Sequence, residues 1–572
     1  MTWFLEDRER LVVERRAIAV LAADADWLVE AEWDLVRAQL ILRLALDVGD
    51  AVHRLEMRYP AMFPHTPPDI VPADPDFRLS DHQWSGGSLC LEYRPDNWRP
   101  DLTGADMVRS AHRLLSADAE TKAGARELPS AHDFTLGQSL RTAFRRHLAT
   151  DELLAAIATL TEWVPARATL RFTIHASDVT SWITSLDAGA GPWLQPAVPK
   201  DLGYEECGVA LRVPSGVLAG TGLDWTHAGL LDVFGAQLPP NDGAKAPTFV
   251  LAGDGEGLRL FWRFVPTADR LTESRIVPAG GLGAERLDRA TGDLGARSVA
   301  VVGCGSAGSK IAASLTRSGV GSLLLVDDDV LMRGNLVRND LDWHGVGDHK
   351  AEALAARLRL INPDVSVQVR RLRLGGQEAS SSAAAALEAI ARCDLIVDAT
   401  AEADAFNLLS SVVTRSGRPL VWLEVFEGGI GGLVARHRPG LDPSPQDMRS
   451  GFLAWCRRQD APWTGRAAGR YAGETEDGRI VVAGDAEVGV IAAHAARFAL
   501  DALGDGLAFP HSMYVIGLKA GWIFEEPFDV RPVSVAPGPR VPAPALGIEE
   551  DAEAIAFIVA LASKGADEDP AA

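Results

Sequence analysis

The chain has 572 residues, of which 47% are hydrophobic and 23% are charged, and its formal net charge at pH 7 is -22. This length predicts about three or four domains that each bury a core of their own. A strongly acidic chain repels nucleic-acid backbones, and the apolar runs are far shorter than the roughly 20 residues that cross a bilayer. We therefore expect a cytoplasmic protein that binds neither nucleic acid nor membranes.

The first 162 residues predict an α+β domain. Apolar residues recur at helical spacing over residues 5 to 23. Alternating segments, which indicate a β-meander, follow near 27 to 35, 38 to 46 and 50 to 58. The proline-rich stretch after them excludes a helix. Helical periodicity then returns over residues 104 to 117 and 137 to 161 and closes this domain.

The rest of the chain changes pattern twice. Residues 163 to 290 contain short alternating runs broken by Gly, Pro and Asp, which predicts a mainly β connecting domain. From 291 to 530, strand-like runs such as "SVAVVG" and "SLLLVD" alternate with Ala-rich helical runs, which predicts a Rossmann-like parallel sheet. Residues 531 to 572 are expected to form a proline-rich tail with a short helix.

The chain has five cysteines and no C-x-x-C pair, and they are Cys90, Cys207, Cys304, Cys393 and Cys456. Their number is odd and they are widely spaced, so the sequence encodes neither a disulfide framework nor a tetrathiolate zinc site. The sequence therefore predicts no structural zinc, and any functional thiol acts alone.

The strongest chemical pattern is "VVGCGSAGSK", in which Gly303, Gly305 and Gly308 follow a strand and open a helix. Backbone amides and the helix dipole at such a turn attract phosphate. Asp327 ends the next strand, where a carboxylate meets a nucleotide ribose. The pattern predicts a bound nucleotide, and the alternative is a glycine turn that serves only close strand–helix packing.

The segment that follows resembles the ThiF family of adenylating enzymes, which includes ubiquitin-activating enzymes and the activators of sulfur-carrier proteins. Asn335, Leu336 and Arg338 match an N-L-x-R pattern, and Lys350 lies in a V-G-x-x-K-A pattern. Fixed cations such as Arg338 and Lys350 stabilise the charge that develops when a carboxylate attacks an α-phosphate. Their alternative role is that of solvated surface charges. The resemblance implies a site for ATP and Mg²⁺ made of Gly303, Gly305, Gly308, Asp327, Asp329, Asn335, Arg338, Lys350 and Asp398.

The chain departs from the family pattern near this site. Asn339 stands where Gln is usual, and Ala401 occupies the place of a second aspartate that is implicated in magnesium binding. Asp398 remains as the expected magnesium ligand, and Glu402 or Asp404 is a candidate for the missing carboxylate.

Two further expectations follow from the resemblance. In some relatives an arginine before the first strand reaches into the partner's active site, and Arg286 and Arg289 are the candidates here. Activating domains of this family commonly dimerise, so we expect a homodimer.

The resemblance also gives a role to Cys456, which lies in the crossover region where activating enzymes carry the thiol that captures the adenylate. A thiolate attacks a mixed acyl anhydride readily, and the neighbouring Arg457 and Arg458 favour the thiolate. The alternative is a buried cysteine in the helix that contains "GFLAW". Cys304 and Cys393 lie in predicted core elements, so we expect them to pack.

The N-terminal domain resembles a ubiquitin-conjugating enzyme. It has a leading helix, a meander, "YPAMFPHTPP", and then Cys90 in "GSLCL" followed by "NWRP". In that family this cysteine accepts a carrier protein by transthiolation and passes it to an amine. The family's H-P-N element is reduced to "DHQW", which leaves His82 without its asparagine, and Asn97 is a candidate replacement. The alternative is an inert core thiol in an inactive fold.

Both resemblances occur in the order found in the activating–conjugating fusion proteins of bacterial antiviral CBASS operons, which attach a CD-NTase to targets. This likeness implies ATP-dependent adenylation of a carrier's C-terminal carboxylate, thioester capture on Cys456, transfer to Cys90 and an isopeptide bond to a target amine. The carrier is a CD-NTase or a separate ubiquitin-like protein. A sulfur-carrier adenylyltransferase, a nucleotide-binding dehydrogenase and a non-enzymatic scaffold remain as alternatives.

Overall fold

The computed structural model describes residues 2–49, 51–74, 79, 83, 87–122, 136–140, 143–187, 191–196, 198–218, 229, 234, 248–255, 257–262, 271–280, 293–461, 472–474, 480–536 and 548–567. The chain divides into two compact units, Met1–Thr142 and Ala143–Ala572. No helix in the described ranges is long and apolar enough to span a membrane.

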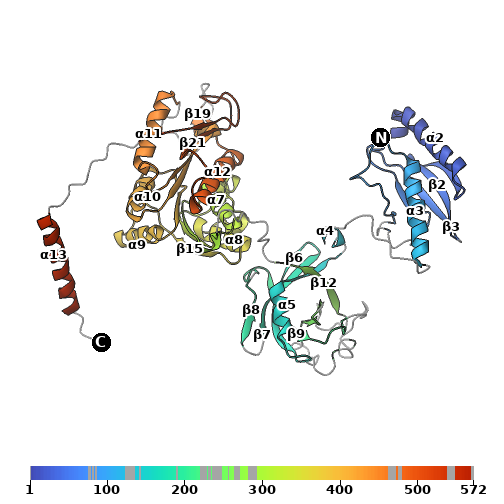
Figure 1. Ribbon diagram of the computed structural model, residues 1–572, viewed down its shortest axis with the longest axis horizontal. Helices are drawn as coiled ribbons and strands as arrows, with labels where there is room; N and C mark the ends of the chain where they lie inside the picture. The colour runs from blue at the N-terminus through green and yellow to red at the C-terminus, as the bar shows by residue number, and fades with distance from the viewer. Residues whose placement is uncertain are drawn as a thin grey trace. The chain divides into compact units, whose positions relative to one another are not determined.

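The N-terminal unit contains a four-stranded antiparallel meander that packs against two long helices (Figure 1). Its elements are α1 (Trp3–Glu6), α2 (Arg8–Asp24), β1 (Leu28–Val36), β2 (Gln39–Val48), β3 (Ala51–Arg58), β4 (Asp69–Pro72), α3 (Gly104–Lys122) and α4 (Leu136–Ser139). Alternate residues of β2, including Leu42, Leu44 and Leu46, point into the core between sheet and helices. The predicted leading helix, meander and helix at residue 104 are therefore confirmed.

A buried carboxylate joins α2 to the start of α3. Glu14 is fully buried, and its carboxylate accepts hydrogen bonds from the Tyr59 hydroxyl at 2.8 Å and the Gly104 amide at 2.7 Å. Arg10 pairs with Glu14 at 2.8 Å and also donates to the carbonyl oxygen of Pro100. Burial raises the pKa of Glu14, and these hydrogen bonds oppose that rise. The network fastens the loop that leads into α3.

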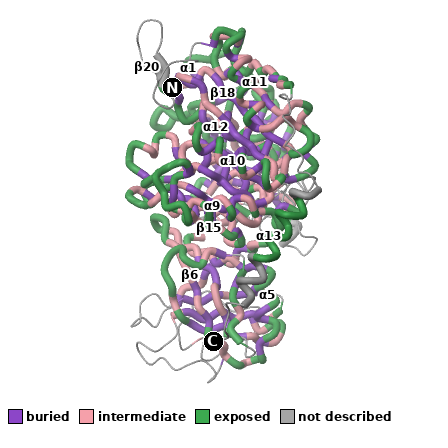
Figure 2. The backbone as a smooth tube through the Cα atoms, turned by 90° about the vertical axis from the view of Figure 1, so that its left-hand side faces the viewer, coloured by how far each residue is buried: buried purple, intermediate pink, exposed green. Residues whose placement is uncertain are grey.

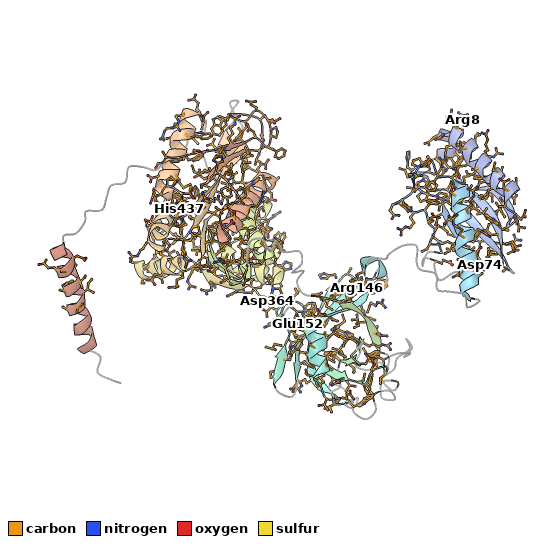
Figure 3. All side chains as sticks on the ribbon, in the orientation of Figure 1. Arg8, Asp74, Arg146, Glu152, Asp364 and His437 are labelled. Carbon is orange, nitrogen blue, oxygen red and sulfur yellow. The ribbon has the colours of Figure 1, made fainter. Side chains whose placement is uncertain are left out.

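Residues 143–280 of the second unit form a closed β-barrel. The strand order is β5-β12-β11-β10-β9-β6-β7-β8, and pairing of β5 with β7 closes the ring. Arg146, which Figure 3 labels, lies at this seam and pairs with Asp178 at 3.0 Å. The elements are β5 (Arg145–Ala149), α5 (Asp151–Ala158), β6 (Ala166–His175), β7 (Asp178–Asp187), β8 (Pro192–Leu194), β9 (Tyr204–Arg212), β10 (Phe249–Gly253), β11 (Leu258–Trp262) and β12 (Thr272–Pro278).

The barrel corrects one prediction. Residues 137–161 were expected to form a single helix, but the strand β5 lies between α4 and α5. Pairing with β12 on one edge and β7 on the other stabilises this strand, and tertiary pairing of this kind overrides local helix propensity. Because β5 belongs to the barrel, the first unit ends at Thr142 and not at residue 162.

Residues 293–536 form a doubly wound sheet. Its strands are β13 (Ser298–Val302), β14 (Ser322–Val326), β15 (Ser366–Arg370), β16 (Leu395–Asp398), β17 (Leu420–Val425), β18 (Gly431–His437), β21 (Met513–Gly517) and β22 (Val530–Pro532). They lie in the order β15-β14-β13-β16-β17-β18-β21-β22, with parallel pairing from β15 to β17 and antiparallel pairing beyond. The order reverses at β13, and sheets of this kind bind ligands at the carboxyl ends beside such a reversal.

Helices cover both faces of this sheet. One face packs against α7 (Ser306–Arg317), α8 (Lys350–Ile361) and α12 (Asp485–Leu503), and the other against α9 (Ser380–Ala391), α10 (Ala403–Ser416) and α11 (Pro445–Arg458). Figure 2 shows buried residues, in purple, running through the layer between these helices. The predicted parallel sheet with alternating helices is confirmed.

Short elements also belong to the second unit. They are the 3-10 helices η5 (Leu294–Ala296), η6 (Arg333–Val337), η7 (Trp343–Gly345) and η8 (Glu427–Gly429), and the strands β19 (Ala472–Glu474) and β20 (Ile480–Val482). The predicted terminal helix is confirmed as α13 (Ile548–Asp567).

Replacing Glu14 with Ala removes the buried acceptor of Tyr59 and Gly104, and breaking a buried charged pair costs about 3–5 kcal/mol. We expect Glu14→Ala to speed backbone amide exchange in α2 and α3, measured by mass spectrometry on the full chain. Glu9→Ala is the control, because Glu9 is exposed on the same helix. Equal exchange in the two variants would contradict the role given to Glu14.

Candidate nucleotide-binding site

A cavity of about 460 Å³ opens at the carboxyl ends of β13, β14, β15 and β16. The glycine loop, the acidic end of β14, the η6 turn and the start of α8 contribute most of its polar lining. The lining residues are Val302, Gly303, Gly305, Ser306, Val326, Asp327, Asp328, Asp329, Asn335, Arg338, Asn339, Lys350, Leu372, Arg373, Leu374, Ala399, Thr400 and Glu402.

The three glycines of the loop have different roles. Gly303 has φ of 89°, and a Cβ there would lie 2.9 Å from the Ala399 carbonyl carbon. A Cβ at Gly308 would lie 1.8 Å from the Gly303 oxygen, so this glycine allows α7 to pack against β13. A Cβ at Gly305 would meet nothing within 4 Å, because Gly305 faces the cavity at the start of α7. Packing explains Gly303 and Gly308, whereas Gly305 leaves space for an anionic ligand at a helix N-terminus.

Asp327 is fixed at the end of β14. Its carboxylate accepts hydrogen bonds from the amides of Cys304 at 2.6 Å and Asp329 at 2.9 Å. Burial raises the pKa of Asp327, and the two amide hydrogen bonds oppose that rise. The carboxylate therefore lies between the glycine loop and the cavity, where it can accept from a ribose hydroxyl.

The predicted cations lie on the same cavity. Lys350 is buried and donates to a carboxylate oxygen of Asp329 at 2.6 Å. Arg338 donates to the Ala483 carbonyl at 3.2 Å, and Lys310 of α7 donates to the Arg338 carbonyl at 2.9 Å. Lys310 also pairs with Asp485 at 2.8 Å, and it is a positioning residue whose role the glycine motif alone does not reveal.

The asparagines of this region shape the loops. The Asn335 side chain accepts from the Met332 amide at 2.8 Å and so closes the η6 turn. Asn339, which replaces the usual Gln, is buried and donates to the Cys304 carbonyl at 3.2 Å. This contact connects the η6 segment to the glycine loop.

The expected magnesium ligand Asp398 does not line the cavity. Its carboxylate is buried and accepts two hydrogen bonds from Thr400, from the amide at 3.0 Å and the hydroxyl at 2.7 Å. Of the two replacements considered, Glu402 lines the cavity and Asp404 does not. Within the described ranges, no three His, Cys, Asp or Glu side chains are grouped to hold a metal ion.

Arg373 also lines the cavity, and sequence motifs do not indicate it. It follows β15 and forms an ion pair with Glu402, which follows β16, at 2.8 Å. The pairing joins positions far apart in the chain, so no local pattern could reveal it. The candidate arginines Arg286 and Arg289 lie outside the described residues.

Cys456 is not at the cavity surface. It lies on α11 in the core between that helix and the sheet, with 0% of its surface exposed. Burial, together with the charge of the nearby Glu424, raises the pKa of its thiol to about 12, against a smaller opposing effect of Arg457. The expectation of an accessible thiolate at Cys456 is therefore not met in this arrangement. Cys304 and Cys393 are buried, as expected.

Cys90 lies in the N-terminal unit on the loop after β4 and is half-buried. Partial burial raises the pKa of its thiol, and the charge of Arg94 opposes this rise. Asn97, considered as an oxyanion donor, accepts from the Arg94 amide at 2.7 Å and donates to the Glu92 carbonyl at 2.8 Å. Its side chain thus holds the loop beside Cys90. His82 lies outside the described residues.

A doubly wound sheet that gathers a glycine loop, a strand-end carboxylate and two cations around one cavity defines a nucleotide-binding α/β domain. Residues 276–450 match the sequence model of the ThiF family. The chain is thus a multidomain α/β protein, and the doubly wound part of its second unit resembles the ThiF family, as the motifs predict.

Known proteins resemble parts of the chain. It is 39% identical over 124 residues to the SAMP-activating enzyme E1 of Haloferax volcanii. This alignment covers 22% of this chain and 43% of that protein. It is 33% identical over 175 residues to the sulfur carrier protein adenylyltransferase of Thermus thermophilus, and this alignment covers 30% of this chain and 59% of that protein. It is 43% identical over 79 residues to the ATP-dependent ubiquitin transferase-like protein Cap2 of Enterobacter hormaechei, and this alignment covers 14% of this chain and 13% of that protein. Each alignment spans less than two thirds of the relative.

Burial predicts which thiols react in the folded chain. Cys207 is exposed, and a thiol with the burial and raised pKa of Cys456 is inert. We expect Cys456→Ala to leave the number of thiols labelled by a disulfide reagent under native conditions unchanged, whereas Cys207→Ala lowers it. Loss of a fast-reacting thiol in Cys456→Ala would mean that α11 opens.

Proposed function

We propose that the second unit uses ATP to adenylate the C-terminal carboxylate of a partner protein. The observation that carries the proposal is the cavity that gathers the glycine loop, Asp327, Arg338 and Lys350 within the segment that matches the ThiF family. The names of two relatives, an activating enzyme and a sulfur carrier protein adenylyltransferase, support this reaction class.

In the proposed reaction, a carboxylate oxygen of the partner bonds to the α-phosphorus of ATP. The bond from that phosphorus to the oxygen bridging to the β-phosphate breaks, and the products are an acyl adenylate and pyrophosphate. Negative charge grows on the leaving pyrophosphate, and fixed cations lower the energy of that charge. Arg338 and Lys350 supply them, and Gly305 leaves room for phosphates at the start of α7.

Lys350 must exchange one anion for another during this reaction. Its ammonium group is paired with Asp329, whose side chain is 66% exposed. Because the Asp329 carboxylate is exposed, it remains hydrated when a phosphate takes its place on Lys350. Magnesium, if bound with ATP, would supply further neutralisation of the triphosphate charge.

We further propose that the acyl group passes to Cys90 and then to a target amine. The thiolate sulfur attacks the acyl carbon and releases AMP, and the amine later attacks the thioester, loses a proton and releases the thiol as an isopeptide bond forms. The half-buried position of Cys90 on a loop supports this role. We also propose a CBASS-like context, with a CD-NTase or a ubiquitin-like protein as carrier and a homodimer as the assembly. The relative named as an ATP-dependent ubiquitin transferase-like protein supports a transfer reaction of this kind.

Capture on Cys456 before Cys90 is a longer version of the same relay. It requires α11 to leave the sheet, because the thiol is buried among side chains such as Met448 and Phe452. The burial of Cys456 favours a second candidate function, a sulfur-carrier adenylyltransferase that stops at the acyl adenylate and uses neither thiol.

Adenylation is tested by ATP–pyrophosphate exchange in the presence of the candidate carrier. We expect Lys350→Ala to lower the exchange rate by roughly 100- to 1,000-fold, the usual cost of removing one group that stabilises transition-state charge. Lys519→Ala is the matched control, since Lys519 pairs with Glu487 and does not line the cavity. No exchange with the wild type, or equal rates in both variants, would refute the proposal.

The thiol steps are tested by intact mass of the chain, without reductant, after co-expression with proteins encoded beside it and addition of magnesium ATP. We expect a thiol-labile adduct on the wild type and on Cys456→Ala, and none on Cys90→Ala. An adduct trapped on Cys456 in Cys90→Ala would establish the longer relay. Pyrophosphate exchange without any adduct would refute the thiol steps and support the second candidate function, a sulfur-carrier adenylyltransferase.

A further inference from the structure

The ion pair between Arg373 and Glu402 has a fixed, flat geometry at the nucleotide cavity. Nε of Arg373 lies 3.3 Å from Oε2 of Glu402, and Nη2 lies 2.8 Å from Oε1. Contacts from two nitrogens to two oxygens hold guanidinium and carboxylate side by side in one plane. Both residues line the cavity, so this plane is part of its wall.

The backbone holds both ends of the pair in place. Leu372 and Leu374, on either side of Arg373, are buried at 6% and 4% exposure. The loop then packs against α10, where a Cβ at Gly375 would lie 2.7 Å from the Cβ of Asp404. The amide of Glu402 donates to the Thr400 hydroxyl at 3.1 Å. The Arg373 side chain nevertheless remains 56% exposed, which leaves guanidinium surface open to a ligand.

The position of the pair indicates which part of a nucleotide it meets. Phosphates belong at the start of α7 with Arg338 and Lys350, and the ribose belongs at Asp327 on the end of β14. The strand next to β14 is β15, and of the residues that follow β15, Leu372 and Arg373 line the cavity. A base joined to a ribose at Asp327 would have these two residues within the same cavity. Guanidinium planes are surfaces on which nucleic-acid bases stack.

We propose that Arg373, held flat by Glu402, is the platform on which the adenine base of ATP stacks. This inference rests on the proposed function, because it takes ATP as the ligand. Arg373 then binds the base without contacting the phosphates, and Glu402 acts through Arg373 as a positioning residue.

The test measures binding of two probes, ATP and inorganic tripolyphosphate, to the full chain by calorimetry with magnesium present. We expect Arg373→Ala to weaken ATP binding by roughly 3- to 30-fold, the range of a cation–π contact. Tripolyphosphate has no base, so its affinity is expected to stay at the wild-type value. Arg371→Ala is the matched control, because Arg371 is equally exposed and paired with Glu352 at 2.9 Å but does not line the cavity.

Glu402→Gln tests the positioning role. We expect it to weaken ATP binding by less than Arg373→Ala, and to add nothing in the Arg373→Ala background, because residues that act as one unit are not additive. Unchanged ATP affinity in Arg373→Ala would overturn the inference, as would an equal loss for tripolyphosphate, which would make Arg373 a phosphate contact. A wild type that binds neither probe would instead refute the proposed function, and the inference with it.

Discussion

The doubly wound domain depends on one close contact, the approach of α7 to the ends of β13 and β16. Gly308 lies so near the Gly303 carbonyl, and Gly303 so near Ala399, that neither position has room for a side chain. The loop held in this way presents the Cys304 amide to Asp327 at 2.6 Å. The same contact therefore determines the positions of the strand-end carboxylate and of the helix N-terminus, and with them the shape of the cavity. The polar site depends on how closely these elements pack.

Patterns within one segment predicted the fold well, because hydrophobic periodicity and glycine spacing reflect forces that act locally. The βα alternation after Ser298 and the meander after α2 both appear as expected. The failure at β5 has a different cause: its strand state depends on β12, more than a hundred residues later in the chain. Arg373 was missed for the same reason, since its partner Glu402 belongs to another strand end.

The cysteines show where sequence context misleads. Arg457 and Arg458 beside Cys456 suggested an activated thiol, yet adjacent residues on a helix point in different directions and Cys456 faces the sheet. Desolvation then outweighs the neighbouring charge. Whether a thiol on a helix is exposed depends on which face of the helix carries it. Packing of α11 against the sheet determines which of its faces is buried.

The closed barrel also constrains the order in which the chain folds during synthesis. The strand β5 is the first of the barrel to leave the ribosome, but it pairs with β12, which ends at Pro278. The ring cannot close until that strand has emerged, whereas every strand of the N-terminal meander pairs with its neighbour in sequence. Long-range pairing slows folding, and domains generally fold as units in the order of synthesis. The N-terminal unit thus completes its core while the barrel is still open, and Cys90 reaches its folded surroundings before the adenylation sheet exists.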